Sequence, residues 1–123
     1  MAREEQARSF HSQGYSCSQA VYSTYADLVG LSAPQARSAS SGWAGGAMIK
    51  CGAVYSAMQI LEKKDADDPD EKARKWNEFS KRYTAENGSL DCRKLLASRT
   101  KNRKTCRDYV GSAAGILEEV LQA

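Results

Sequence analysis

The sequence has no long apolar run and no closely spaced pair of cysteines. None of its apolar stretches approaches the ~20 residues that a membrane-spanning helix needs. The charged start, Met1 to Gln6, does not resemble a secretory signal. No sustained alternation of apolar and polar residues predicts a sheet, and no nucleotide-binding glycine pattern or serine-type triad is present. We therefore expect a cytoplasmic protein whose thiols are reduced at rest.

Length and composition indicate one globular unit. Hydrophobic residues make up 41% of the 123 residues and charged residues 27%, the balance of a soluble protein with a core. A chain of this length suits one domain, which we expect to span residues 1–123. The formal net charge of +3 is too small to imply a nucleic-acid or membrane partner by itself.

Helix signals occur along almost the whole chain. The signals are serine and threonine caps, apolar residues at helical spacing, and glycines at the expected ends. They predict helices over about 2–12, 17–30, 32–41, 48 or 51 to 62, 69–87, a short stretch around 92–96, and 105–121. On the helix near 51, Cys51, Val54, Met58 and Leu61 form the expected apolar face. The prediction is an all-α, single-domain bundle of about six or seven helices.

Four cysteines are the main chemical feature: Cys17, Cys51, Cys92 and Cys106. Their spacings of 34, 41 and 14 residues include no C-x-x-C pair, so any shared site must be assembled by the fold. Each cysteine is expected in the first turn of a helix, on the side that faces the core. The unpaired N–H groups and positive dipole of a helix start stabilise a thiolate, which is the reactive and metal-binding form.

Basic neighbours add to this effect at three of the four positions. Lys50 precedes Cys51, Arg93 and Lys94 follow Cys92, and Arg103, Lys104 and Arg107 surround Cys106. Cys17 has no adjacent cation, which favours it as a resolving or structural partner rather than an attacking thiol. The alternative is structural, because cysteine is a small hydrophobe that is often buried for packing alone.

At this point the residues resemble a known family. The matching features are Phe10 and Gly14 before Cys17-Ser18-Gln19-Ala20-Val21, the glycine-rich segment that leads into Cys51-Gly52-Ala53, Cys92 followed by Leu95-Leu96, and Cys106 followed by Tyr109-Val110. This pattern is similar to that of the small bacterial C_GCAxxG_C_C proteins, a redox-active family with four cysteines and a CGAxxG motif. The resemblance implies that Cys17, Cys51, Cys92 and Cys106 are the four signature thiols. The chain departs from the motif at Ser56, where the family has glycine.

Two sulfur hypotheses follow. In the first, the four cysteines are catalytic and cycle between dithiol and disulfide, as in a thiol–disulfide oxidoreductase or electron-transfer protein. Cys92 with Cys106 and Cys17 with Cys51 are the expected pairs, and an unidentified redox partner or electron donor is needed. In the second, Cys17, Cys51, Cys92 and Cys106 are ligands of zinc or an iron–sulfur cluster. The first requires no cofactor.

A third hypothesis is a binding module with structural cysteines. Between Arg93 and Arg107 the chain has seven basic residues and no acidic one, a pattern that could bind phosphates or an acidic partner. No nucleic-acid motif accompanies it, so a solvated surface is the preferred interpretation. His11, the single histidine, is either solvated or a base toward a thiolate. The apolar C-terminal helix could support a homodimer.

Overall fold

A computed structural model describes residues 3–43, 51–91, 94–95 and 105–122. These residues form six α-helices and one 3₁₀-helix: α1 (Arg3–Ser12), α2 (Cys17–Thr24), η1 (Ala26–Val29), α3 (Ala33–Ala39), α4 (Gly52–Lys64), α5 (Pro69–Asn87) and α7 (Cys106–Gln122). The predicted all-α fold class is confirmed. The glycine-rich segment before Cys51, Cys92, and most of the basic stretch from Arg93 lie outside the described residues. No described helix is long and apolar enough to cross a membrane.

The helix starts follow local capping signals. Ser16 and Gln19 form a reciprocal capping box at α2, and Ser32 and Gln35 form another at α3. At α7, the Asp108 carboxylate accepts a hydrogen bond from the Thr105 N–H at 2.7 Å, and the Asp108 N–H donates to Thr105 Oγ1 at 3.3 Å. These side chains satisfy N–H groups that have no partner within the helix.

The predicted helix from Cys17 to Gly30 is shorter than expected. α2 ends at Thr24, Tyr25 takes a non-helical conformation, and the chain continues as the tighter η1. Tyr25 is fully buried, and its hydroxyl donates a 2.8 Å hydrogen bond to the Ala114 carbonyl of α7. The break therefore coincides with a tertiary contact to the last helix, which the local sequence pattern does not encode.

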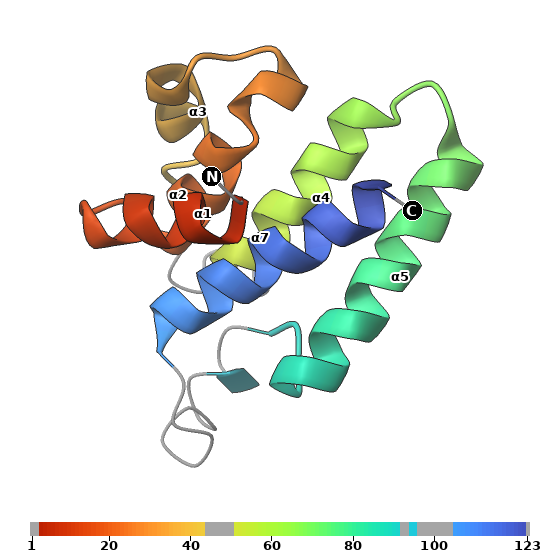
Figure 1. Ribbon diagram of the computed structural model, residues 1–123. Coiled ribbons are helices and arrows are strands. Elements are labelled where there is room, and N and C mark those ends of the chain that lie inside the picture. The colour runs from red at the N-terminus through yellow and green to blue at the C-terminus, as the bar shows by residue number, and fades with distance from the viewer. Residues whose placement is uncertain (1–2, 44–50, 92–93, 96–104, 123) are drawn as a thin grey trace.

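The core lies where α2, α4 and α7 meet (Figure 1). α2 and α4 contact each other extensively, α7 packs on both, α5 covers α4 and α7, and α3 rests on α2. On α4, the predicted apolar face is too narrow. Val54 and Leu61 are buried as expected and Met58 is half-exposed, while Ala57 and Ile60 are also fully buried. α4 contacts α2, α5 and α7, so more than one of its sides is covered.

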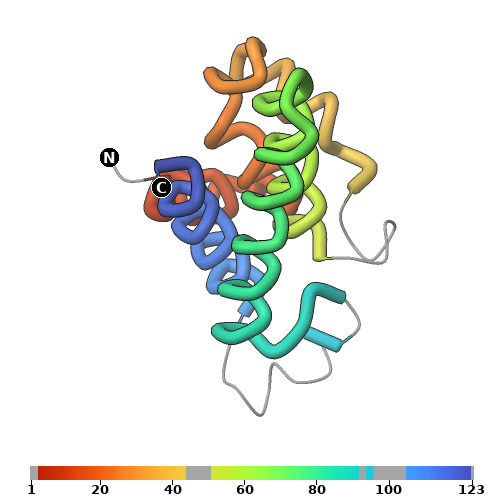
Figure 2. Tube along the Cα trace, turned by 90° about the vertical axis from the view of Figure 1, so that its right-hand side faces the viewer, coloured from red at the N-terminus to blue at the C-terminus, as the bar shows by residue number. Residues whose placement is uncertain are grey.

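α1 packs antiparallel on α7, with contacts at each end and in between. Near the N-terminus of α1, the charge of Glu118 in α7 acts on Arg3. Near the C-terminus of α1, Arg107 Nε of α7 donates to Ser12 Oγ at 3.1 Å. Between them, a Cβ added to Gly115 would meet Glu4, and one added to Gly111 would clash with the Arg8 guanidinium. Figure 2 shows the two helices lying against each other. The two glycines thus leave room on the surface of α7 for the Arg8 and Glu4 side chains of α1.

Candidate functional site

The three described cysteines all occupy helix starts. Cys17 is the first residue of α2, Cys51 is the N-cap of α4, and Cys106 is the first residue of α7. Cys51 is 5% exposed, while Cys17 and Cys106 are half-buried. The predicted helix-start placement is therefore confirmed for these three. Cys92 lies outside the described residues.

The fold brings together two cysteines that are far apart in sequence. Cys17 and Cys106 lie 4.1 Å apart, and no disulfide joins them. A disulfide bond is about 2.05 Å long, so the two residues are adjacent without being bonded. The pairs expected from the sequence, Cys92 with Cys106 and Cys17 with Cys51, keep these two residues apart. Packing of α2 against α7 creates this contact.

Cys51 lies in a more enclosed environment next to a buried tyrosine. The Tyr83 hydroxyl donates to Cys51 Sγ at 3.9 Å, and the Tyr83 side chain is fully buried. Burial first, and then the charge of Cys51, its hydrogen bond, and the charges of Tyr109 and Cys17, raise the pKa of Tyr83 far above its ordinary value. Tyr83 therefore remains a protonated donor at all physiological pH values. The charges of Cys51 and, more weakly, of Cys17 thus both act on the Tyr83 phenol.

Tyr83 is the inner end of an aromatic stack on α5. Its ring stacks with Phe79 at 5.7 Å between centroids, and Phe79 stacks with Trp76 at 5.8 Å, both at an interplanar angle of 16°. The sequence pattern predicted these three residues as core filling, and Phe79 and Tyr83 are fully buried. The sequence analysis missed the role of the Tyr83 hydroxyl as a partner of Cys51. The helical spacing of the stripe shows which side is buried but not what the hydroxyl meets.

The residues on both sides of Cys92 are tied to the site. The Cys51 N–H donates to the Leu90 carbonyl at 2.8 Å, and the Tyr109 hydroxyl donates to the Leu95 carbonyl at 3.1 Å. Leu90 is thereby attached to the start of α4, and Leu95 to the first turn of α7. These two bonds connect the chain around position 92 with the helix starts that hold Cys51 and Cys106.

His11 lies near the Cys106 end of α7. Burial first, and then the positive charge of Arg107, lower the pKa of His11 below its ordinary value. The imidazole is consequently neutral at physiological pH. It is half-buried rather than fully solvated. A neutral imidazole can accept a proton, so the predicted role as a base toward a thiolate stays a hypothesis.

The geometry of the described residues offers no assembled metal site. No group of three or more histidine, cysteine, aspartate or glutamate side chains in the described parts of the chain could hold a metal ion. Since Cys92 is outside those parts, the predicted four-cysteine ligand set for zinc or an iron–sulfur cluster is not tested.

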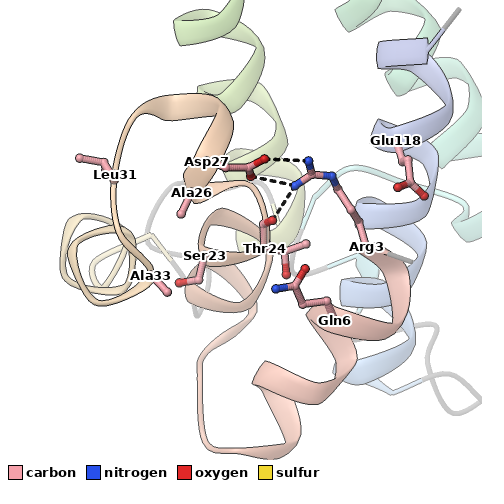
Figure 3. Close-up of a pocket in the computed structure, with 9 residues that line it drawn as sticks. All are labelled: Arg3, Gln6, Ser23, Thr24, Ala26, Asp27, Leu31, Ala33 and Glu118. Carbon is pink, nitrogen blue, oxygen red and sulfur yellow. Dashed lines mark hydrogen bonds and ion pairs between the residues drawn. The ribbon is translucent and has the colours of Figure 1, made fainter. Parts of the chain in front are cut away.

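A polar cavity lies away from the thiols. It has a volume of about 610 Å³, and its walls come from α1, α2, η1, the start of α3 and the last part of α7 (Figure 3). Arg3 spans it: the guanidinium forms two 3.0 Å hydrogen bonds with the Asp27 carboxylate and donates to the Thr24 carbonyl at 2.7 Å. No cysteine lines this cavity. The ion pair fastens α1 to η1, and the hydrogen bond to the Thr24 carbonyl fastens α1 to the end of α2.

The protein is a small helical bundle that carries thiols at the starts of three helices. Comparison with protein families identifies the group: the model of the family described as "Putative redox-active protein (C_GCAxxG_C_C)" matches residues 15–120. The chain belongs to this family. A search of curated proteins and a search of solved structures each found no match.

The structure accounts for the serine at the motif glycine position. Ser56 is fully buried between α4 and α2, and its hydroxyl donates to the Ser18 carbonyl at 2.8 Å. Ser18 in turn donates through Oγ to the Ser40 carbonyl at 2.8 Å. The small side chain still permits close helix packing, and its hydroxyl has a partner. The departure from the motif therefore adds a polar link between α4 and α2, directly behind Cys17.

Proposed function

We propose that this protein carries out two-electron thiol–disulfide exchange, with Cys17 and Cys106 as its redox pair. The 4.1 Å separation of these two residues supports the proposal most directly. Both are half-buried, so a small reactant can approach, whereas Cys51 at 5% exposure is shielded. Membership of a family described as redox-active agrees with this chemistry.

Cys106 is the proposed attacking thiol. It is the first residue of a 17-residue helix and precedes the exposed Arg107. Cys17 has the helix start without an adjacent cation and acts as the resolving thiol. Cys51, whose sulfur accepts a hydrogen bond from the Tyr83 hydroxyl, is the third described thiol, and we assign it a later internal exchange.

The reaction balances as follows. The Cys106 thiolate attacks one sulfur of a disulfide RSSR, forms a mixed disulfide and releases the thiolate RS⁻. The Cys17 thiol loses its proton to solvent, attacks the Cys106 sulfur and releases the second RS⁻. The two thiolates released take up the two protons that the cysteines gave up. The protein has lost two electrons, and RSSR has been reduced to two RSH.

Disulfide mapping tests the proposal. Fully reduced protein is oxidised with the neutral bis(2-hydroxyethyl) disulfide, residual thiols are alkylated, and the linked peptides are identified by mass spectrometry. We expect a Cys17–Cys106 bridge in the wild type and in Cys51→Ser, and a persistent mixed disulfide on Cys106 in Cys17→Ser. Four alkylated cysteines after oxidation, or protein purified without chelator that contains stoichiometric metal, would contradict the proposal.

A further inference from the structure

Two arginines flank the turn that leads into Cys17. Arg107 is anchored to one end of the turn by the 3.1 Å hydrogen bond from its Nε to Ser12 Oγ. Arg37 is anchored to the other end, with its guanidinium carbon 4.0 Å from the centroid of the Tyr15 ring. The turn is tight, because Gly14 has a φ of +100° and the Tyr15 N–H donates back to the Phe10 carbonyl at 3.1 Å. Both guanidinium groups are thus positioned by one short segment: Tyr15 lies two residues before Cys17, and Arg107 directly follows Cys106.

Both arginines are exposed, and their positive charge is not balanced by a carboxylate of the described residues. Many other described cations form ion pairs: Arg3, Arg8, Lys72, Arg74, Lys75, Arg82 and Lys94. Arg107 and Arg37 instead rest on a hydroxyl and an aromatic ring. The neighbouring carboxylate of Asp108 accepts hydrogen bonds from the N–H and hydroxyl of Thr105.

The positive charge of Arg107 also acts on His11. Burial first, and then the charge of Arg107, lower the pKa of His11. The neutral imidazole therefore adds no positive charge of its own. The positive charge of Arg107 therefore lies directly beside Cys106, whereas the protein as a whole has a net charge of only +3.

We infer that the substrate of this site is a small disulfide with a carboxylate on each side of its S–S bond. The inference rests on the proposed exchange between Cys17 and Cys106. Guanidinium groups recognise carboxylates through paired hydrogen bonds, and those of Arg37 and Arg107 are pre-positioned by their neutral partners. Such a disulfide carries one carboxylate for each of the two arginines.

The chemical step is the one written above, with the dicarboxylate disulfide as RSSR. The Cys106 thiolate displaces one carboxylated thiolate, and Cys17 displaces the second. Two electrons pass from the cysteine pair to the disulfide, and two carboxylated thiols leave. The arginines take no part in bond making, so they act as binding residues for the substrate charge.

The test compares three small disulfides in stopped-flow reactions with fully reduced protein: dithiodiglycolate with two negative charges, the neutral bis(2-hydroxyethyl) disulfide, and cystamine with two positive charges. A single pair of unit charges at about 7 Å in water changes a rate by a factor of about three. For two arginines, the rate ratio of the anionic to the neutral disulfide should be about tenfold higher in the wild type than in an Arg37→Gln/Arg107→Gln double variant. The difference should shrink at high salt, and cystamine should show the opposite trend.

The rate ratio separates charge recognition from thiol reactivity, because any change in the thiolate fraction of Cys106 affects all three reactions equally. Lys64→Gln is the matched control: it removes one exposed cation at the far end of α4, about 20 Å along that helix from Cys51. A ratio unaffected by the arginine variants would overturn the inference and leave the proposed function intact. Failure of the neutral disulfide to produce the Cys17–Cys106 bridge would instead refute the proposed function.

Discussion

Closing a Cys17–Cys106 disulfide should stabilise the fold substantially, because it joins residues near the two ends of the chain. The loop from Cys17 to Cys106 contains 90 residues, both cysteines included. In the chain-entropy description, a cross-link over a loop of this size raises the free energy of unfolding by about 4.6 kcal/mol at 25 °C. For a chain of 123 residues, that corresponds to an increase in Tm of about 18 °C. Strain in the bridged state would reduce both figures, so they are upper limits.

The same energy must appear in the redox equilibrium. Folding favours the disulfide by as much as the disulfide favours folding, so the reduction potential of the pair should be about 100 mV lower in the folded protein than in the denatured chain. Denaturant unfolding of the oxidised and reduced forms measures the first quantity. Titration against glutathione buffers, with and without denaturant, measures the second.

The two measurements constrain each other. Cys17→Ser should abolish the stability difference between oxidising and reducing conditions, whereas Cys51→Ser should retain most of it. Equal stability of the two wild-type forms would refute the reasoning, as would a stability gain unmatched by a change in potential. A gain that disappears in Cys51→Ser would identify a different bridge.

Three further predictions concern a buried serine, two buried tyrosines and the distant ion pair. Ser56→Ala should lower the free energy of unfolding by about 1 kcal/mol through loss of a buried hydrogen bond, and Ser56→Gly by about 2 kcal/mol because glycine also weakens the helix; a stabilising Ser56→Gly would refute this account. Tyr83→Phe should cost less than Tyr25→Phe in denaturant unfolding, because sulfur is a weaker acceptor than a carbonyl; the reverse order would contradict the assigned partners. The hydrogen bond from Arg3 lowers the pKa of Asp27 in the folded protein. The stabilisation of the fold by this ion pair is therefore fully present above the unfolded-state pKa near 3.9, and it is lost as the pH falls through the folded-state pKa of Asp27. Since Asp27 is largely exposed, Asp27→Asn should cost about 0.5 kcal/mol at pH 7 and almost nothing near pH 2, and a cost that persists in acid would point to a structural effect of the substitution.

Helix starts and stops could be predicted from the sequence because their signals are local. Ser16, Ser32 and Thr105 each have a polar partner three residues later, and the structure forms the capping interaction at all three. Gly30 and Gly88 end their elements in left-handed conformations, with φ of +73° and +93°. A cap needs only the residues of one turn, so the four-residue pattern carries the necessary information.

The arrangement of the thiols could not be predicted in the same way. The expected pairing relied on sequence proximity and basic neighbours, yet the contact between Cys17 and Cys106 depends on how α2 packs against α7. Likewise, the hydroxyl of Tyr83 meets Cys51 only after α5 has docked against α4. These are tertiary relations between distant segments, and no window of the sequence contains both partners.

The antiparallel packing of α1 on α7 links the first helix to the position of Cys106 at the start of α7. α1 contains no cysteine and precedes the region matched by the family model, which begins at residue 15. Nevertheless, Gly111 and Gly115 leave room for the side chains of Arg8 and Glu4, and the same register sets Ser12 beside Arg107. A slip of one turn would shift the start of α7 by about 5.4 Å, more than the present 4.1 Å between Cys17 and Cys106. Substitutions in α1 could therefore change the ease of disulfide closure without altering any sulfur, so this helix offers a means of tuning redox behaviour from outside the motif-bearing region.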